Sequence, residues 1–234
     1  MKNAAVGAKK LSALLRKIGH VVPPAMASTP GDDDESASTA EASRHDPIAT
    51  LVMSFLLWES SADKAQAAYD RILESVVDFN DLRVSMPHET VEMIGPRYPL
   101  ALNRAQRLRA SLRNIYLREH AVSLDKPAAA GKRDLKKYID SLEGMVPYVA
   151  NRVLLLCFDT HGVPVDEQLR TALIEAEVAD ASVEVPELAS WLASQIRAGD
   201  AIGAHAALQS WMDDKAAPSG RSPRKSPRKN HSRR

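Results

Sequence analysis

Apolar residues recur at intervals of three and four between residues 46 and 214, which is the spacing of helices that bury one face. Asp46 and Pro47 form a helix start, because an Asp N-cap accepts backbone N–H bonds and proline fits the first helical position. No stretch alternates apolar and polar residues as a half-buried strand would. The pattern predicts an all-α protein with helices at residues 48–58, 63–77, 80–84, 88–94, 100–119, 134–141, 147–158, 166–179, 186–198 and 201–212. In the helix at 100–119, the predicted buried stripe consists of Leu102, Ala105, Leu108, Leu112, Ile115 and Tyr116.

Two segments fall outside this pattern and divide the chain into three parts. Residues 21–43 are rich in Pro, Ser, Thr, Ala and acidic residues, and they cannot bury enough apolar surface to offset the entropy lost on ordering. Residues 1–45 are therefore predicted to be a basic, then acidic, disordered segment, in which residues 9–18 can form a short basic helix. Residues 46–213 are predicted to form the folded helical domain, and residues 214–234 a basic disordered tail.

The formal net charge of the 234 residues is only +1, but the charges are segregated along the chain. Residues 97–137 contain eleven Lys and Arg against three Asp and Glu, a net charge of +8. Residues 138–214 contain three basic against thirteen acidic residues, a net charge of −10, and residues 215–234 contain eight basic residues and no acid. The positive segments favour binding to a polyanion such as nucleic acid.

Cysteine content and hydropathy exclude several classes of protein. Cys157 is the only cysteine, so the chain has neither an intramolecular disulfide nor an all-cysteine metal or iron–sulfur site. No apolar run approaches the roughly 20 residues of a membrane span. The basic residues 1–17 lack the apolar core of a secretory signal. We therefore expect a cytoplasmic protein with no membrane contact, no metal and no cofactor.

Residues 138–174 carry the most informative pattern in the chain. A helix leads into the turn Leu142-Glu-Gly-Met-Val146, and then come the helical sequence PYVANRVLLLCF and the sequence HGVPVDEQLRTALI. This order resembles the helix-hairpin-helix DNA glycosylase superfamily, which includes endonuclease III and the adenine-mismatch glycosylases. The resemblance extends more weakly over residues 47–211. It implies that Asp166, which opens a helix after a short apolar segment, stands at the place of the family's catalytic aspartate.

The resemblance also implies roles for the hairpin and for Asp166. Backbone N–H groups of Gly144, Met145 and Val146, with the following helix N-terminus, would hold a DNA phosphate without reading sequence. The target nucleotide would then be extruded into a pocket. Asp166, ionised at a helix N-terminus, would stabilise the sugar cation or activate the attacking nucleophile. An ordinary helix N-cap is the alternative interpretation of Asp166.

The chain departs from the family pattern at several positions. The lysine with which bifunctional members attack the sugar is replaced by Tyr148, which resembles some monofunctional mismatch glycosylases. Val146 replaces the second hairpin glycine, and the four cluster cysteines of endonuclease III are absent. We expect Tyr148 to belong to the catalytic site, or to be a packed helix residue. We expect Trp58 and Glu59 to form or flank the base pocket, with a solvated helix end as the alternative for Glu59.

Arginines on the predicted helix at 100–119 are the second indication of DNA binding. Six Arg and no acid lie between residues 97 and 118, which favours a phosphate-contacting surface over a merely solvated basic face. The tail carries two Ser-Pro-Arg-Lys units, which resemble minor-groove arms of histone-like proteins. The DNA-binding residues predicted from these segments are Arg104, Arg107, Arg113, Arg152, Arg224, Lys225, Arg228 and Lys229.

Taken together, these patterns predict a DNA-binding base-excision-repair protein, a monofunctional DNA glycosylase that hydrolyses the N-glycosidic bond of a damaged or mismatched base. Its partner would be duplex DNA, its location nucleoid-associated, and its state monomeric. Two alternatives remain open: a catalytically inactive DNA-binding protein of the same fold, and a helical scaffold whose tails bind nucleic acid.

Overall fold

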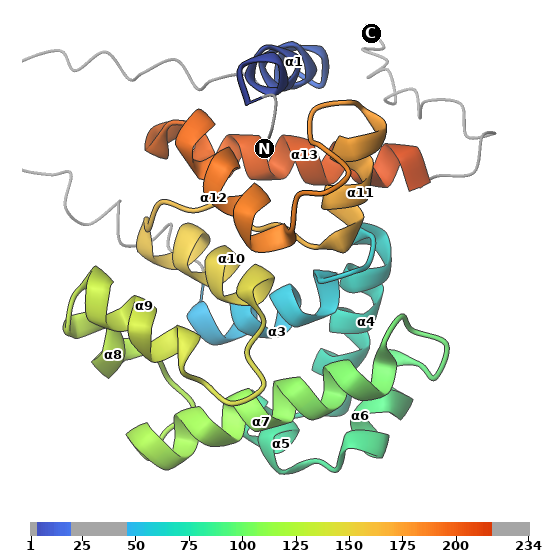
Figure 1. Cartoon of the computed structure of the whole chain (residues 1–234). Helices are drawn as coiled ribbons and strands as arrows, with labels where there is room; N and C mark the ends of the chain where they lie inside the picture. The colour runs from blue at the N-terminus through green and yellow to red at the C-terminus, as the bar shows by residue number, and fades with distance from the viewer. Residues whose placement is uncertain (1–3, 20–45, 217–234) are drawn as a thin grey trace, which may run out of the picture.

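The described part of the chain is built from helices packed around two hydrophobic cores (Figure 1). The structure is a computed structural model that describes residues 4–19 and 46–216, and this part contains no strand. Its helices are α1 Ala4–Lys17, α3 Pro47–Leu57, α4 Ala62–Ser75, α5 Phe79–Val84, α6 Pro87–Ile94, α7 Ala101–Glu119, α8 Asp125–Ala129, α9 Lys132–Asp140, α10 Pro147–Phe158, α11 Glu167–Glu175, α12 Val185–Gln195 and α13 Ala201–Ala216, with a 3₁₀ turn at Ala198–Asp200.

The first core surrounds α3, which packs against α4, α7 and α10. Asp46 caps this helix by accepting a bond from Ile48 N at 2.9 Å, and Pro47 occupies the first turn as expected. Val52, Phe55 and Leu56 are completely buried, because α3 is covered on almost every side. The first core thus fixes the end of α3, after which the chain turns at Trp58 and Glu59.

The second core joins the beginning of the described chain to its end. Leu11 of α1 packs with apolar residues of α11, α12 and α13, and only 2% of its surface is exposed. Lys10 adds an ion pair with Glu177 at 2.6 Å. In Figure 1, α1 lies above α13 at the top of the molecule. This second core holds α11 and α13 beside the first core, so that the two together frame the region around residue 166.

Most predicted helices are confirmed, and the differences have local causes. The basic helix predicted at residues 9–18 begins earlier, at Ala4, and is packed on the protein rather than part of a disordered segment, because Leu11 is buried. The short α8 is not foreseen, since its sequence DKPAA offers no apolar period. The predicted helix at 166–179 ends at Glu175, where Glu177 adopts φ +55° and the Leu173 carbonyl accepts N–H bonds from Val178 and Ala179. The linker at 21–43 and the tail from 217 lie outside the described residues.

The buried face of α7 differs in one respect from the predicted stripe. Leu102 is 54% exposed, whereas Arg104 is completely buried. The inward face follows Ala101, Ala105 and Leu108, and Leu102 points away from that line. Among the described residues, no helix is long and apolar enough to cross a membrane.

Candidate functional site

Asp166 lies at the N-terminus of α11, directly after a buried extended segment. Its Oδ1 accepts a hydrogen bond from Leu169 N at 2.9 Å, and its Oδ2 accepts one from Glu59 N at 3.0 Å. Only 4% of the residue is exposed. Burial raises the pKa of this carboxyl, while the backbone N–H bonds act in the opposite direction. Asp166 is therefore a helix N-cap that also fixes a residue 107 positions away.

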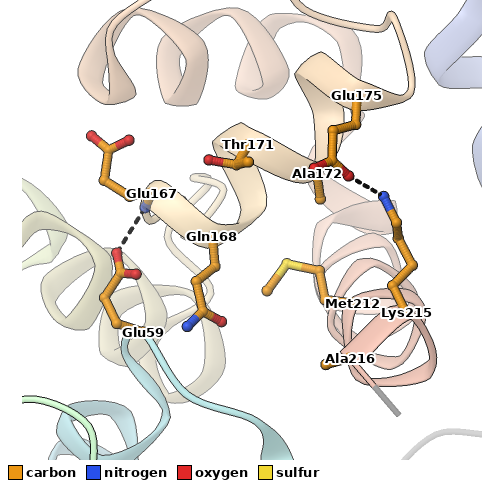
Figure 2. A pocket seen from close by; sticks show the side chains of 9 residues that line it. All are labelled: Glu59, Glu167, Gln168, Thr171, Ala172, Glu175, Met212, Lys215 and Ala216. Carbon is orange, nitrogen blue, oxygen red and sulfur yellow. Dashed lines mark hydrogen bonds and ion pairs between the residues drawn. The ribbon is translucent and has the colours of Figure 1, made fainter. Parts of the chain in front are cut away.

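Glu59 forms the second half of an interlocked pair with Asp166. Its Oε1 accepts a hydrogen bond from Glu167 N at 2.8 Å (Figure 2). Each carboxylate therefore accepts from a backbone N–H next to the other residue. Glu59 has φ +52°, a conformation that costs a non-glycine residue on the order of 1–2 kcal/mol. Such strain persists only where surrounding contacts enforce it, and it gathers at functional sites. Burial, and next the Asp166 carboxylate, raise the pKa of Glu59.

Arg104 holds the turn that carries Glu59 in place. Its Nη2 donates to the carbonyl oxygens of Trp58 at 2.6 Å and Pro99 at 3.1 Å. The guanidinium also lies 5.0 Å from the ring centre of Tyr98. Burial lowers the pKa of Arg104 to about 10, so the group stays charged at neutral pH. With no exposed surface, Arg104 does not contact phosphate, and that expectation is wrong: its role is to position the Trp58–Glu59 turn.

A cavity of about 430 Å³ lies beside the carboxylate pair, between α11 and the end of α13. In Figure 2, Glu59 and Gln168 stand at one side of it, with Met212 and Lys215 of α13 at the other. The lining residues are Glu59, Glu167, Gln168, Thr171, Ala172, Glu175, Met212, Lys215 and Ala216. Glu59 is half-buried and lines the cavity, whereas Asp166, which accepts a hydrogen bond from Glu59 N, is not among the lining residues. That Glu59 belongs to a base pocket stays a prediction.

Tyr148, which the resemblance led us to expect in the catalytic site or packed in a helix, does not line this cavity. The residue is 4% exposed, its ring packs edge-on against His205 at 6.4 Å, and its hydroxyl has no hydrogen-bond partner among the described residues. Burial raises the pKa of the phenol well above its usual range. Its burial favours the packed interpretation of Tyr148 over a place in the catalytic site.

The hairpin between α9 and α10 is held tightly against α7. Gly144 adopts φ +79°, and a Cβ at this position would lie 2.7 Å from the carbonyl oxygen of Arg107. Ser111 Oγ donates to the Glu143 carbonyl at 2.9 Å, and Arg107 Nη1 donates to the Gly144 carbonyl at 3.3 Å. Met145 and Val146 are half-buried against the first core. Gly144 is therefore required by the close approach of two backbones, whatever it binds.

The remaining predicted DNA-binding residues fall into different surroundings. Arg113 of α7 is exposed, and Arg107 is half-buried between the hairpin and the Trp58 ring, 5.8 Å away. Arg152 donates to Ser54 Oγ at 2.9 Å and lines a separate cavity with residues of α3, α4 and α13, so it does not share the hairpin surface. Arg224, Lys225, Arg228 and Lys229 lie outside the described residues. In residues 4–19 and 46–216, no group of three or more His, Cys, Asp or Glu could hold a metal ion.

The fold of the described chain is shared with DNA glycosylases of known structure. A non-covalent endonuclease III–DNA complex matches with a TM-score of 0.62 and 14% identity, over 87% of this chain and 85% of that one. A thermostable thymine-DNA glycosylase matches with a TM-score of 0.55 and 17% identity, over 94% of this chain and 90% of that one. The Clostridium acetobutylicum 8-oxoguanine glycosylase/lyase, bound to DNA with cytosine opposite 8-oxoguanine, matches with a TM-score of 0.58 and 15% identity. The match covers 74% of this chain and 62% of that one.

No protein-family model matches the sequence, and no curated protein matches it. At these identities the similarity establishes the fold: the chain has the helix-hairpin-helix DNA glycosylase fold that residues 138–174 predict. Sequence reasoning also found Asp166, Gly144 and Glu59. It missed the structural roles of Arg104 and Ser111, for which the sequence carries no signal beyond their place on α7.

Proposed function

We propose that this protein is a monofunctional DNA glycosylase that hydrolyses the N-glycosidic bond of a damaged or mismatched base in duplex DNA. The observation that carries the proposal is the interlocked pair of Glu59 and Asp166 at the N-terminus of α11, beside a cavity of about 430 Å³. The fold supports the proposal, because solved DNA glycosylases share it. The cavity is large enough for a base rotated out of the duplex.

The two carboxylates supply the electrostatics that glycosidic cleavage needs. The bond breaks with its electron pair leaving on the base nitrogen, and C1′ of the sugar becomes an oxocarbenium-like cation. Negative charge on Glu59 at the cavity, with Asp166 beside it, stabilises that cation. A water oxygen then adds to C1′, and its proton passes to the Glu59 carboxylate and from there, through solvent, to the departed base. The products are the free base and an abasic site.

The position of Tyr148 supports hydrolysis without a lyase step. A lyase forms a Schiff base between an amine and the sugar, and a phenol offers no amine. Tyr148 is also buried and does not line the cavity. We therefore expect no covalent protein–DNA product after borohydride reduction.

The DNA-binding surface in this proposal is the hairpin with the exposed part of α7. The hairpin would hold a phosphate through its backbone N–H groups, and Arg107 and Arg113 would add charge beside it. The basic tail residues would contribute salt-dependent, sequence-independent affinity. Duplex DNA is the proposed partner and the nucleoid the proposed place of action.

Single-turnover assays test the proposal directly. The full-length protein is incubated with duplexes that contain uracil, A opposite 8-oxoguanine, G·T, hypoxanthine or an alkylated purine, and hot alkali then reveals abasic sites. We expect alkali-dependent cleavage of at least one duplex, reduced at least tenfold in Glu59→Gln and in Asp166→Asn. The matched control is Glu92→Gln, an exposed glutamate of α6, which keeps the wild-type rate. Because Asp166→Asn places an amide N–H₂ opposite Glu59 N, thermal unfolding of each variant is measured alongside.

One observation favours a second candidate, a non-catalytic DNA-binding protein of the same fold. Both oxygens of Asp166 are already occupied by backbone N–H groups, and the residue is 4% exposed, which is what a purely structural cap requires. If no duplex is cleaved but the protein binds duplex DNA in a salt-dependent manner, this second function replaces the first.

A further inference from the structure

The cavity beside the carboxylate pair has an unbalanced charge. Its charged lining residues are Glu59, Glu167, Glu175 and Lys215. The one lysine is paired with Glu175, at 2.8 Å between Nζ and Oε2, on the α13 side of the cavity (Figure 2). Glu167 is paired with Arg170 at 3.1 Å. No ion pair of the described residues includes Glu59, and the carboxylates of Asp166 and Glu167 both raise its pKa.

The surroundings of Glu59 show what this imbalance costs the protein. Two carboxylates meet there, and each is held by a backbone N–H rather than by a cation. Arg104 is the cation that lowers the pKa of Glu59, but the Asp166 carboxylate acts on it more strongly, and the guanidinium is directed to the Trp58 and Pro99 carbonyls instead. Burial and the Asp166 charge both raise the pKa of Glu59, which is the response of an acid that lacks a positive partner. A positive charge brought into the cavity would relieve this repulsion.

The leaving base is the part of the substrate that can bring this charge. A neutral base departs as an anion unless an acid protonates it, and an anion next to Glu59 is repelled. The lining offers no histidine to act as that acid, and its lysine is held by Glu175. A purine alkylated on a ring nitrogen already carries a positive charge, so it departs neutral and needs no proton. Its charge is also attracted to Glu59 before the bond breaks.

We propose that this cavity selects cationic bases, so that the substrates are purines alkylated on a ring nitrogen, with Glu59 as the residue that discriminates charged from neutral bases. The inference rests on the proposed glycosylase function and names its substrate class. Gln168, beside Glu59 in the cavity, supplies a neutral amide that can accept from or donate to the edge of the base (Figure 2). Thr171 and Met212 complete a lining that is otherwise neutral.

The test compares charged and neutral bases in one duplex sequence. Single-turnover excision by the full-length protein is measured on duplexes with 7-methylguanine, hypoxanthine or uracil at the same position, and each rate is divided by the rate of spontaneous base loss. We expect the ratio for 7-methylguanine to exceed that for either neutral base at least tenfold. Glu59→Gln should lower the corrected excision rate of 7-methylguanine at least tenfold.

A second variant tests the charge of the cavity without touching the carboxylate pair. Lys215→Met removes the only basic lining residue and makes the cavity more negative. It should raise the preference for 7-methylguanine over hypoxanthine about threefold, because one positive charge fewer then opposes the carboxylates of the lining. Gln209→Ala, on the other face of α13, is the control that leaves the preference unchanged.

The outcomes separate this inference from the proposed function. Excision of hypoxanthine or uracil as fast as 7-methylguanine, after the same correction, overturns the selection of cationic bases and leaves the glycosylase function standing. No excision from any duplex by a folded protein overturns the glycosylase function, and the inference with it. A Lys215→Met variant that prefers neutral bases also overturns the inference.

Discussion

Replacing Gly144 by alanine tests the close packing of the hairpin on α7. The added Cβ would lie 2.7 Å from Arg107 O, 2.9 Å from Arg107 Cα and 3.2 Å from Ala110 Cβ. The first two are backbone atoms of a helix that is itself packed on the first core, so they cannot move aside cheaply. The same residue must also keep φ +79°, a conformation that alanine disfavours.

These two costs add to a measurable loss of stability. Positive φ costs about 1–2 kcal/mol for a non-glycine residue, and a forced overlap in a packed region costs about 1–3 kcal/mol. The expected loss for Gly144→Ala is therefore about 2–5 kcal/mol, which for a domain of this size lowers Tm by about 10 °C. Thermal unfolding followed by circular dichroism measures the shift. Binding to undamaged duplex DNA, measured at fixed salt, should weaken in the same variant because the hairpin moves away from α7.

Two other glycines separate the two costs. Gly19 has φ +73° and nothing within 4 Å of an added Cβ, so Gly19→Ala reports the cost of positive φ alone, about 1 kcal/mol. Gly199 has neither a positive φ nor a close neighbour, so Gly199→Ala should change stability by less than about 0.5 kcal/mol. If Gly144→Ala is no more destabilising than Gly19→Ala, the hairpin does not pack on α7 as described here.

Three further predictions follow from buried polar groups. Tyr148→Phe removes a hydroxyl that has no hydrogen-bond partner among the described residues, so it should raise the free energy of unfolding by up to about 1 kcal/mol in denaturant titration. Glycosylase activity should stay unchanged, and a large loss of activity would show that the hydroxyl takes part in catalysis. Arg104→Leu leaves the Trp58 carbonyl without its donor and should lower the free energy of unfolding by about 3 kcal/mol in the same titration. The same substitution at the exposed Arg113 should not lower it to that extent. Folding raises the pKa values of Glu59 and Asp166 above their ordinary values of 4.5 and 3.8. The folded state therefore holds protons more tightly than the unfolded state, and this stabilises the protein fully at pH values below the ordinary pKa values. The stabilisation is lost as the pH rises through the raised pKa values of the folded state. As the pH rises from the ordinary to the raised pKa values, the unfolding temperature of the wild type should therefore fall relative to that of Glu59→Gln. If the unfolding temperatures of the two proteins change in parallel with pH, the interaction of Glu59 with Asp166 is contradicted.

Periodicity and capping residues predict most of this fold, because they are local. The Asp46–Pro47 start of α3 and the N-cap at Asp166 need only a few neighbouring residues, and both are confirmed. The hairpin with Gly144 is predicted by resemblance alone. The partner of Asp166 is a different matter, since Glu59 lies 107 positions earlier and only the folded chain brings the two together.

The errors come from polar residues in the interior. Helical spacing from Ala101 and Leu108 places Arg104 on the buried face of α7, but a charged side chain is not expected there, because only the folded chain brings it the Trp58 carbonyl from 46 positions away. Tyr148 is ambiguous, since an aromatic residue with a polar tip fits both a pocket and a core. The basic helix near the start of the chain is misjudged for another reason: Leu11 gains its burial from α11–α13, far along the chain.

The division of the protein into two cores has a consequence for the order in which it folds. The buried residues of the first core run from Ile48 to Leu154 without leaving that stretch of chain, so this core can assemble while later residues are still being synthesised. The second core combines Leu11 with residues from Leu155 to Leu208, and its contacts close a loop that contains the whole first core. Contacts of such long sequence separation form late. The cavity beside Glu59, which needs α11 and α13, is therefore completed only when the last helix docks, and a ribosome-bound chain that ends before α13 would hold the hairpin without the pocket.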